Sequence, residues 1–597
     1  MTYSDNPRKI YGKVKIIYSD GEISSEMAVN VSGNAQISYP EQIYMGYLSP
    51  SIKACSMDGN SYMGQGFQMN GYGLICGWKS DVHSNSAGTF ATPPWLEISF
   101  ISRPVYKWKV IGDNKLNEYP IDFDITFYSN DVVIEIKQVR NNTAVNAEIN
   151  LAQPLTEITK IRIDILKWNK PNAKAKILQF FDALEEEYGG SDLKSFEVLE
   201  ELGSQGVNHG ITSDTATITL LNKDRKFDKG YLKDMLLLGR KVIPYIGIEN
   251  NGKVEYTKLG TFYSDEWNVP QNSQWVTLKC NDKLMKLQDI VYTGYPYTED
   301  VSLYDIAEDI LIKSGYATGS YEIDSDLNND IIPYAFLRKS SAWEAITEIC
   351  LSGMCSAYID RDDKLKIYKT QSNESGINIL PSSIFNYSKN SRLTDFSNYV
   401  EVQYTNVLRE EELVKAYENQ VILDANGRIT VIADYSEEIA DAVITISPLT
   451  GLELISFESG VNAGKFEIKN NTGNIIVAKV SIEGYKLSIS TQTAAVQEDE
   501  SVERWGRQEV SYQSSCLIQS YEKAYETGQH ILLTLKQGSA EIDISWRGDP
   551  ELKLMDKFTA TDRFSDSTDY VCQYNRYSYD GGLKQQTKGR ADNGGME

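Results

Sequence analysis

The chain has 597 residues, and 83 aspartate and glutamate residues against 59 lysine and arginine residues give it a formal charge of −24. This length indicates about three to five domains, because a single hydrophobic core stops growing well below it. An acidic surface repels phosphate backbones, so nucleic acid is not an expected partner. The sequence has no apolar run of about 18 residues and no apolar N-terminal segment, so we expect neither membrane insertion nor a signal peptide.

Cysteine and histidine are too sparse for a metal centre. The seven cysteines include one close pair, Cys350 and Cys355, and the three histidines are His83, His209 and His530. Structural zinc sites use paired cysteines or clustered histidines, so we expect no metal and no other cofactor. The odd, scattered set of thiols indicates a reduced compartment rather than a disulfide framework.

Familiar catalytic motifs are absent. The sequence has no His-Glu-x-x-His, no Gly-x-Ser-x-Gly and no glycine-rich phosphate loop, which predicts a protein that is not an enzyme. A glycosidase needs only two carboxylates, so the 83 acidic residues leave that alternative open.

The first half of the chain has the pattern of β-strands. Residues 1–50 are predicted to form an N-terminal β segment, because KIYGKVKIIYS alternates between polar and apolar residues. Residues 51–190 repeat strand-like phrases with almost no helix, which predicts a β-sandwich. Within it GWKS, PPWLEISF, YPIDFDITFY and IRIDILKWNKPNAKAKI follow in an order that resembles a discoidin-like, galactose-binding-type jelly roll.

This resemblance implies a glycan-binding end of the sandwich. Ligands of such domains meet loops in which an exposed aromatic ring stacks on a sugar and polar groups bind its hydroxyls. The loop GWKSDVHSNSAGTF offers Trp78, Asp81, His83 and Asn85, which are the candidate binding residues for host cell-wall polysaccharide. The alternative is that Trp78 packs in the core while the polar residues only form turns.

Residues 191–292 are predicted to form a β-barrel with a short helix near Asp282–Leu287. In this region ITSDTATITLLNKDRKF, GRKV and GTFYSDEW follow in order, and together they resemble the hub-type proteins at the distal end of phage tails and phage-tail-like particles. The barrel core is predicted to consist of apolar strand residues from this region and from one later strand: Ile218, Leu220, Val242, Ile246, Phe262 and Trp546.

Residues 293–390 are predicted to form a small α+β domain. Ser302 and Ser341 each precede an amphipathic helix with an acidic residue three positions later, which is the signature of a helix N-cap. Asp360 to Asp363 form the turn of a following hairpin, and the order WEAITEI then YIDRDDKLKI also resembles the tail-hub family.

The remaining chain is predicted to return to β structure. Residues 391–407 are expected to form a strand that returns to the barrel, and residues 408–495 an inserted β domain. Residues 496–597 are expected to form a second hub-like barrel with a long helix that ends at Gly538.

Arg547-Gly548-Asp549 is also the ligand signature of integrin-binding proteins. Here it follows the alternating strand residues Ile542, Ile544 and Trp546 and precedes Pro550. Glycine followed by Asp-Pro is typical of a turn, so we interpret the tripeptide as a turn between two strands.

The sequence thus predicts a mainly β, multi-domain protein with a jelly-roll sandwich, hub-like barrels, a small α+β domain and a β insertion. The tail-hub resemblance implies a structural component of a virion tail tip or baseplate, assembled in the host cytoplasm. It implies other tail or baseplate proteins as partners and a homo-oligomer, a trimer, around the tail axis. Two alternatives remain open, a peripheral receptor-binding or tail fibre protein and a tail-associated cell-wall hydrolase.

Overall fold

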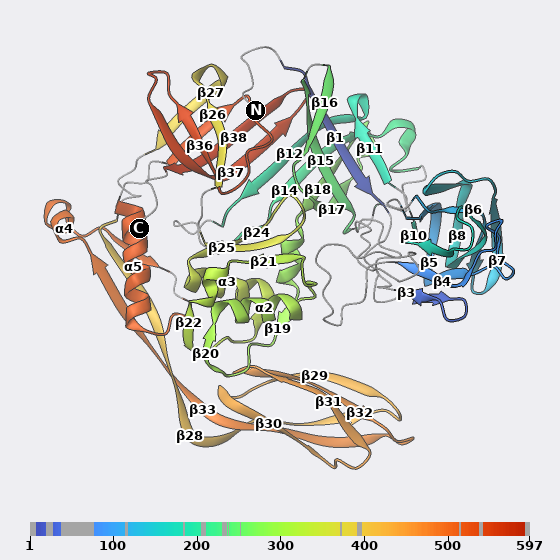
Figure 1. Ribbon diagram of the computed structural model, residues 1–597. Helices are drawn as coiled ribbons and strands as arrows, with labels where there is room; N and C mark the ends of the chain where they lie inside the picture. Colours follow the sequence, from blue (N-terminus) through green and yellow to red (C-terminus); the bar gives the residue numbers. More distant parts are fainter. Residues whose placement is uncertain are drawn as a thin grey trace. The chain divides into compact units, whose positions relative to one another are not determined.

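The computed structural model describes residues 8–18, 28–37, 77–113, 117–182, 185–203, 210–229, 236, 238–250, 252–369, 373–390, 397–512, 515–536 and 541–591 (Figure 1). They form two compact units. The hub unit comprises the described parts of Met1–Val14, Tyr188–Asn222 and Val242–Glu597, and the sandwich unit those of Lys15–Glu187 and Lys223–Lys241. The described helices include none that is both long and apolar enough to cross a bilayer.

The sandwich unit consists of a six-stranded and a three-stranded sheet. The larger sheet has the order β10-β5-β8-β6-β7 with β2 beside β5, and the smaller has the order β3-β4-β9. The strands are β2 (Ala28–Val31), β3 (Gln36–Ile37), β4 (Trp78–His83), β5 (Trp95–Ile111), β6 (Pro120–Ser129), β7 (Val132–Val139), β8 (Asn146–Trp168), β9 (Lys174–Ile177) and β10 (Gln179–Asp182).

Alternation on β6 positions the sandwich core. Phe123, Ile125 and Phe127 have no exposed surface and pack with the indole rings of Trp108 and Trp168. The predicted β-sandwich is present, but it begins before residue 51, because β2 and β3 pair with β5 and β4. The prediction of a separate N-terminal β segment at residues 1–50 is therefore wrong. β2 and β3 belong to the sandwich, and β1 (Ile10–Ile17) lies in another sheet, between β11 and β15.

That other sheet, the hub sheet, has 14 strands, and its main path runs β11-β1-β15-β17-β18-β14-β12-β37-β38-β35-β27. Off this path, β16 pairs with β15, and β36 pairs with both β37 and β26. Its remaining strands are β11 (Glu185–Gly189), β12 (Leu193–Glu201), β14 (Thr215–Leu221), β15 (Lys241–Asn250), β16 (Lys253–Lys258), β17 (Phe262–Asn268), β18 (Trp275–Asn281), β26 (Asn373–Ile379), β27 (Ile384–Asn390), β35 (Glu541–Trp546), β36 (Asp556–Thr561), β37 (Ser567–Tyr579) and β38 (Leu583–Ala591). Short 3-10 helices lie at Gly190–Asp192, Lys223–Arg225 and Pro381–Ser383.

The two predicted barrels are halves of this one sheet. β12 pairs with β14 on one edge and with β37 on the other, in a register that places Phe196 opposite Tyr579. The rings of Phe196 and Tyr579 stack with their centroids 5.3 Å apart. All six predicted core residues are buried, with exposed fractions of 5% or less: Ile218, Leu220, Val242, Ile246, Phe262 and Trp546.

A small α+β domain is present, but its predicted range 293–390 is too long, because residues 373–390 form β26 and β27 of the hub sheet. Helices α2 (Leu303–Lys313) and α3 (Ala342–Gly353) begin at Ser302 and Ser341, and Ser341 forms a reciprocal capping box with Glu344. The helices pack in one core with the sheet β13-β24-β25-β21. The other elements are β13 (Gly210–Ile211), the 3-10 helix Lys283–Gln288, β19 (Val291–Tyr292), β20 (Glu299–Ser302), β21 (Tyr321–Ile323), the 3-10 helix Ser325–Asn328, β22 (Ile331–Tyr334), β23 (Ser340–Ser341), β24 (Cys355–Ile359) and β25 (Leu365–Lys369).

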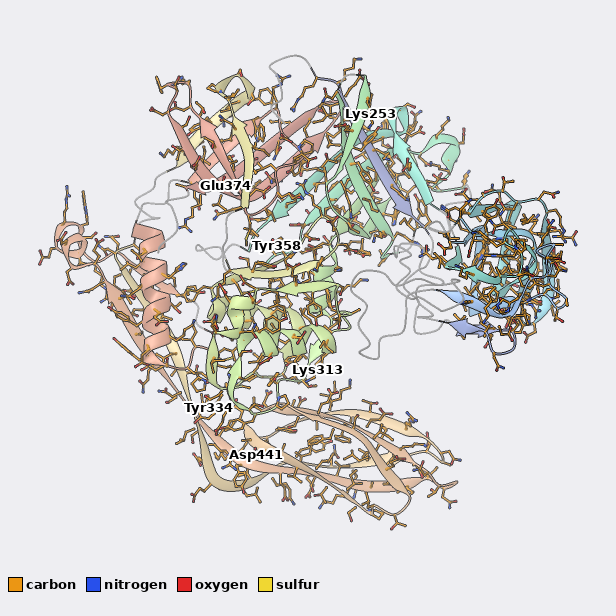
Figure 2. All side chains as sticks on the ribbon, viewed as in Figure 1. Lys253, Lys313, Tyr334, Tyr358, Glu374 and Asp441 are labelled. Carbon is orange, nitrogen blue, oxygen red and sulfur yellow. The ribbon has the colours of Figure 1, made fainter. Side chains whose placement is uncertain are left out.

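Residues 391–407 do not return to the hub sheet. From Tyr399 they form the first part of β28 (Tyr399–Leu423), which pairs along its whole length with β33 (Ile476–Gln497). This long pair excludes β28 from the hub sheet, because β33 occupies one edge of β28 and β34 (Glu509–Tyr512) pairs with the other. Tyr334 of the small domain packs in a cluster with Val407 of β28 (Figure 2).

The β28–β33 ribbon also carries the long helix. α5 (Tyr521–Lys536) packs its Ala524 and Ile531 against Val402 and Val496, so the helix belongs to the ribbon rather than to a second barrel. The predicted end at Gly538 lies outside the described residues. The far half of the ribbon forms the inserted β domain with the sheet β29-β32-β31. Its elements, together with a short helix, are β29 (Arg428–Asp434), β30 (Ile439–Ser447), β31 (Leu452–Ser459), β32 (Ala463–Asn470) and α4 (Asp499–Trp505).

Candidate functional site

The predicted glycan loop has a buried tryptophan. Trp78 has no exposed surface and belongs to the sandwich core, so its ring offers no face to a sugar. It lies on β4, between β3 and β9, and pairs with Ile37 and Ile177. Trp78 therefore has the core-packing role that was the alternative to stacking.

The polar residues of the same loop make local bonds. The Asp81 carboxylate accepts a hydrogen bond from the Asn34 backbone N–H at 3.0 Å. The Asn85 side-chain oxygen accepts from the N–H groups of Ala87 and Thr89 at 2.9 and 3.0 Å, which closes a turn. His83 is exposed, and so is Asn85. The structure thus places all four candidates on β4 or just after it; His83 and Asn85 are exposed, Asp81 is half-buried and Trp78 is buried.

Asn85→Ala is expected to lower the free energy of unfolding of the sandwich unit by about 1 kcal/mol, because two backbone N–H groups lose their acceptor. Thermal unfolding of the full chain, followed at the transition of this unit, measures the effect. Ser86→Ala in the same exposed turn is the control and should change nothing. Equal melting of Asn85→Ala and wild type would contradict the turn role.

The Arg-Gly-Asp tripeptide is a turn, as interpreted from the sequence. Gly548 adopts a φ of +80°, a conformation that glycine accepts without strain. The Arg547 N–H donates to the Ser383 carbonyl at 2.9 Å, and the Asp549 N–H donates to the Gln585 side chain at 2.7 Å. Asp549 is only 5% exposed and lines a groove, so the tripeptide is not displayed at the tip of a long exposed loop, where an adhesive Arg-Gly-Asp normally lies.

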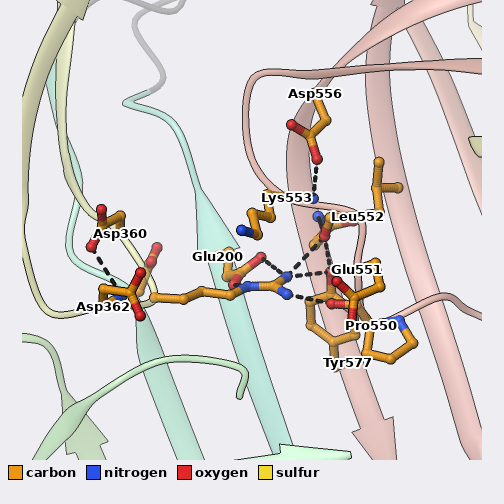
Figure 3. Close-up of polar contacts among 12 residues, drawn as sticks. Glu200, Asp360, Asp362, Pro550, Glu551, Leu552, Lys553, Asp556 and Tyr577 are labelled. Carbon is orange, nitrogen blue, oxygen red and sulfur yellow. Dashed lines mark hydrogen bonds and ion pairs between the residues drawn. The ribbon is translucent and has the colours of Figure 1, made fainter. Parts of the chain in front are cut away.

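The strongest polar site of the hub unit is centred on Arg361, in the turn between β24 and β25. Its guanidinium donates two hydrogen bonds to Glu200 of β12, Nε to Oε1 at 2.7 Å and Nη2 to Oε2 at 3.0 Å. Nη2 also donates to the Leu552 carbonyl and to the Tyr577 hydroxyl, both at 2.8 Å, and Nη1 donates to the Pro550 carbonyl (Figure 3). One side chain thus joins the small domain to both halves of the hub sheet.

This cluster, the Arg361 junction, is buried. Arg361 is 9% exposed and Glu200 is 4% exposed. Burial alone would lower the pKa of Arg361, but Glu200 and Tyr577 raise it above its usual value. A buried guanidinium with paired acceptors fixes geometry well, because its planar fork matches a carboxylate. The junction therefore holds the small domain in one orientation on the hub sheet.

Two buried aspartates lie next to the junction. Asp282 accepts from the Ser213 hydroxyl at 2.7 Å and from the N–H groups of Asp214 and Leu284 at 2.8 and 2.9 Å. Asp214 accepts from the Glu201 N–H at 2.9 Å. The cavity beside this pair measures about 10 Å³, which is room for one water and none for a sugar. The pair therefore terminates strands and caps a helix rather than acting as a glycosidase site.

Burial raises the pKa of Asp282 to about 6 and also raises the pKa of Asp214. A folded-state pKa above the unfolded value gives stabilisation that is complete at low pH and is lost as pH rises through about 6. The comparison is with Asp282→Ser, which keeps a helix cap but cannot titrate. The free energy of unfolding of wild type minus that of Asp282→Ser is expected to decrease as the pH rises from about 4 to about 7. Urea unfolding of both proteins at each pH measures this difference. A difference that does not change with pH would contradict the assignment.

Metal ligands do not gather in the part of the chain that the structure describes. No group of three or more histidine, cysteine, aspartate or glutamate side chains there could hold an ion. The five described cysteines, Cys280, Cys350, Cys355, Cys516 and Cys572, are free thiols. His209 lies outside the described residues.

No family model and no curated protein matches the sequence. Similar solved structures include the 43 kDa tail protein of prophage MuSo2 from Shewanella oneidensis, with 11% identity over 68% of this chain and 95% of that chain and a TM-score of 0.40. Prophage tail protein gp18 from Listeria monocytogenes has 10% identity over 68% of this chain and 91% of that chain, with a TM-score of 0.33. The family 32 carbohydrate-binding module of Streptococcus pneumoniae EndoD has 16% identity over 26% of this chain and 93% of that chain, with a TM-score of 0.15. At these scores the likeness assigns this chain no activity and no partner.

Proposed function

We propose that this protein is a structural component of the tail tip or baseplate of a phage or phage-tail-like particle. Its hub unit would assemble around the tail axis with other tail proteins. The observation that carries the proposal is the Arg361 junction together with the position of the phrases that resemble the tail-hub family. Those phrases lie on β14, β15, β17, α3, β24 and β25, and the junction joins β24 and β25 to the hub sheet.

Rigidity is the property that this arrangement supplies. An assembly subunit benefits from domains that keep one orientation, and the buried fork of hydrogen bonds from Arg361 to Glu200, Leu552 and Tyr577 resists rotation. The hub sheet adds continuous backbone pairing across β12 and β37. The expected role is therefore assembly rather than chemistry.

Light scattering on the purified chain tests the assembly. A mass of three chains supports the trimer that the tail-hub resemblance implies, and a mass that stays at one chain at all concentrations and with neighbouring tail proteins added contradicts a ring-forming hub. Turnover of purified peptidoglycan would instead support the alternative of a tail-associated hydrolase.

A second candidate function is receptor binding by the sandwich unit. The exposed side chains of His83 and Asn85, with Asp81 beside them, favour this role for the loop that follows β4. Binding of the full chain to purified host cell-wall polysaccharide should weaken in His83→Ala if the loop takes part. Unchanged binding in that variant would leave the sandwich unit as a spacer, and a peripheral position of the protein in images of the particle would favour receptor binding over the hub role.

A further inference from the structure

The hub unit has an acidic groove. It has a volume of about 490 Å³ and is lined by the β15–β16 hairpin, by β26 and by the segment that follows Gly548. Its charged lining residues are Glu255, Glu374, Asp549, Glu551, Asp556 and Lys553. Five carboxylates therefore face one ammonium group. We propose that this acidic groove binds a lysine or arginine side chain presented by an extended segment of a partner protein.

Asp549 is a buried carboxylate in the wall of the groove and is only 5% exposed. Its carboxylate accepts one hydrogen bond, from the Glu551 N–H at 2.9 Å, and forms no ion pair with any described residue. The guanidinium of Arg8 is bound instead to the carbonyls of Arg547 and Gly548. Burial raises the pKa of Asp549, the nearby charge of Glu551 also raises it, and the charge of Arg8 offsets part of the rise.

Three other groove carboxylates, Glu551, Asp556 and Glu374, each have one hydrogen-bond or ion-pair partner nearby. Glu551 accepts from the Thr257 hydroxyl at 2.6 Å, and Asp556 accepts from the Lys553 N–H at 2.9 Å (Figure 3). Glu374, labelled on β26 in Figure 2, pairs with Lys557 at 3.2 Å and keeps a side chain that is 77% exposed. A carboxylate oxygen accepts more than one hydrogen bond, so these residues can still receive an ammonium or guanidinium group.

The groove suits a side chain better than a metal ion. Among the described residues no three carboxylates converge closely enough to coordinate a cation. A lysine or arginine head group needs only two or three acceptors spread over several ångströms, and its stem fills a larger volume. The acidic lining and the volume of the groove therefore favour a long cationic side chain.

Two strand edges along the groove favour an extended partner. Within the described part of the hub sheet, β16 pairs only with β15, and β26 pairs only with β36. Thr257 and Glu255 of β16 and Ser375 and Ile377 of β26 all line the groove. An unpaired edge offers backbone N–H and carbonyl groups to an added strand, while pockets between the strands select its side chains. The groove would bind such a segment whether or not the protein is part of a phage tail.

The test uses the full chain and the peptide acetyl-Thr-Lys-Thr-Lys-Thr-amide, which favours an extended conformation and places its lysines on one face. The expected result is saturable binding by calorimetry, with the matched glutamine peptide binding about tenfold or more weakly. Asp549→Asn combined with Glu551→Gln should weaken lysine-peptide binding by a similar factor. The amide oxygen introduced by Asp549→Asn still accepts from the backbone N–H of residue 551, so thermal unfolding of this double variant should match wild type.

Because the whole chain is acidic, the test needs a control variant that changes the net charge by the same amount as the groove variant. Glu411→Gln with Glu412→Gln removes two exposed carboxylates from β28, outside the groove, and should leave binding unchanged. If both double variants weakened peptide binding equally, the proposal would be overturned in favour of general attraction to an acidic surface. The same would follow if wild type bound the lysine peptide no more tightly than the groove variant. Displacement of the peptide by calcium chloride at constant ionic strength would overturn it in favour of a metal site.

Discussion

Arg361→Met is expected to lower the free energy of unfolding of the hub unit by about 3–5 kcal/mol. The substitution keeps much of the apolar stem but removes all the hydrogen bonds that the guanidinium donates, whereas Tyr577 and Asn575 still donate to the Leu552 carbonyl. Glu200 would remain as a buried, unpaired carboxylate, and the carbonyls of Pro550 and Leu552 would lose a partner. An uncompensated buried charge is the larger cost, because desolvation of the carboxylate is no longer offset by the guanidinium.

Urea and thermal unfolding of the full chain measure this loss, with amide hydrogen exchange locating it in the hub unit. Adding Glu200→Gln to Arg361→Met should recover part of the stability, since the orphaned charge is then removed. Arg338→Met is the control, because the Arg338–Glu438 pair lies at the surface and should contribute no more than about 1 kcal/mol. Equal unfolding curves for Arg361→Met and Arg338→Met would show that the junction does not stabilise the fold.

Trp546→Ala is expected to cost about 3–5 kcal/mol of hub stability. The ring is 5% exposed and packs in a cluster with Ile544, Leu552 and Phe558. Its indole N–H donates to the buried Thr587 hydroxyl at 3.0 Å, so truncation creates a cavity and also removes a buried hydrogen bond.

Trp546→Phe separates the two contributions, because it keeps most of the volume and loses the hydrogen bond; a cost of about 1 kcal/mol is expected from the bond itself. Trp505→Ala is the matched control: this tryptophan is 57% exposed on α4, and its removal should leave the unfolding temperature nearly unchanged. If Trp546→Ala also melted like wild type, the buried position of the ring in the β35 cluster would be wrong.

Local patterns in the sequence determined the elements of this protein. Alternation on β6 and β14 identified the buried faces, since successive side chains of a strand point to opposite sides. Ser302 and Ser341 identified the starts of α2 and α3, because a hydroxyl followed by an acidic residue satisfies free backbone N–H groups. Gly548 identified a turn, because its backbone conformation favours glycine. Each of these signals depends on neighbours within a few positions of the chain.

Strand pairing was decided by the tertiary structure. Residues 399–407 have a strand pattern that fits any sheet, and only the 22-residue partner β33 explains why β28 leaves the hub sheet. The same holds for β12 and β37, which merge two predicted barrels into one sheet. Alternation marks a strand as half-buried but carries no information on which distant strand will lie beside it.

The candidate sites show the same division most clearly. Asp360-Arg361-Asp362-Asp363 has the composition of an exposed hairpin turn, and the structure has a turn there. Arg361 is nevertheless buried, because Glu200 and Tyr577 supply its acceptors. Both acceptors lie more than 150 positions away, one earlier and one later in the chain. Trp78 next to a polar loop was compatible with an exposed sugar platform and with core packing, and β3 and β9 on both sides bury it. The sequence by itself specifies the turn, the strand and the helix cap, because these depend on short-range sterics and hydrogen bonding. Whether a side chain in such an element is exposed depends on residues far away in the sequence, and only the folded structure brings those residues next to it.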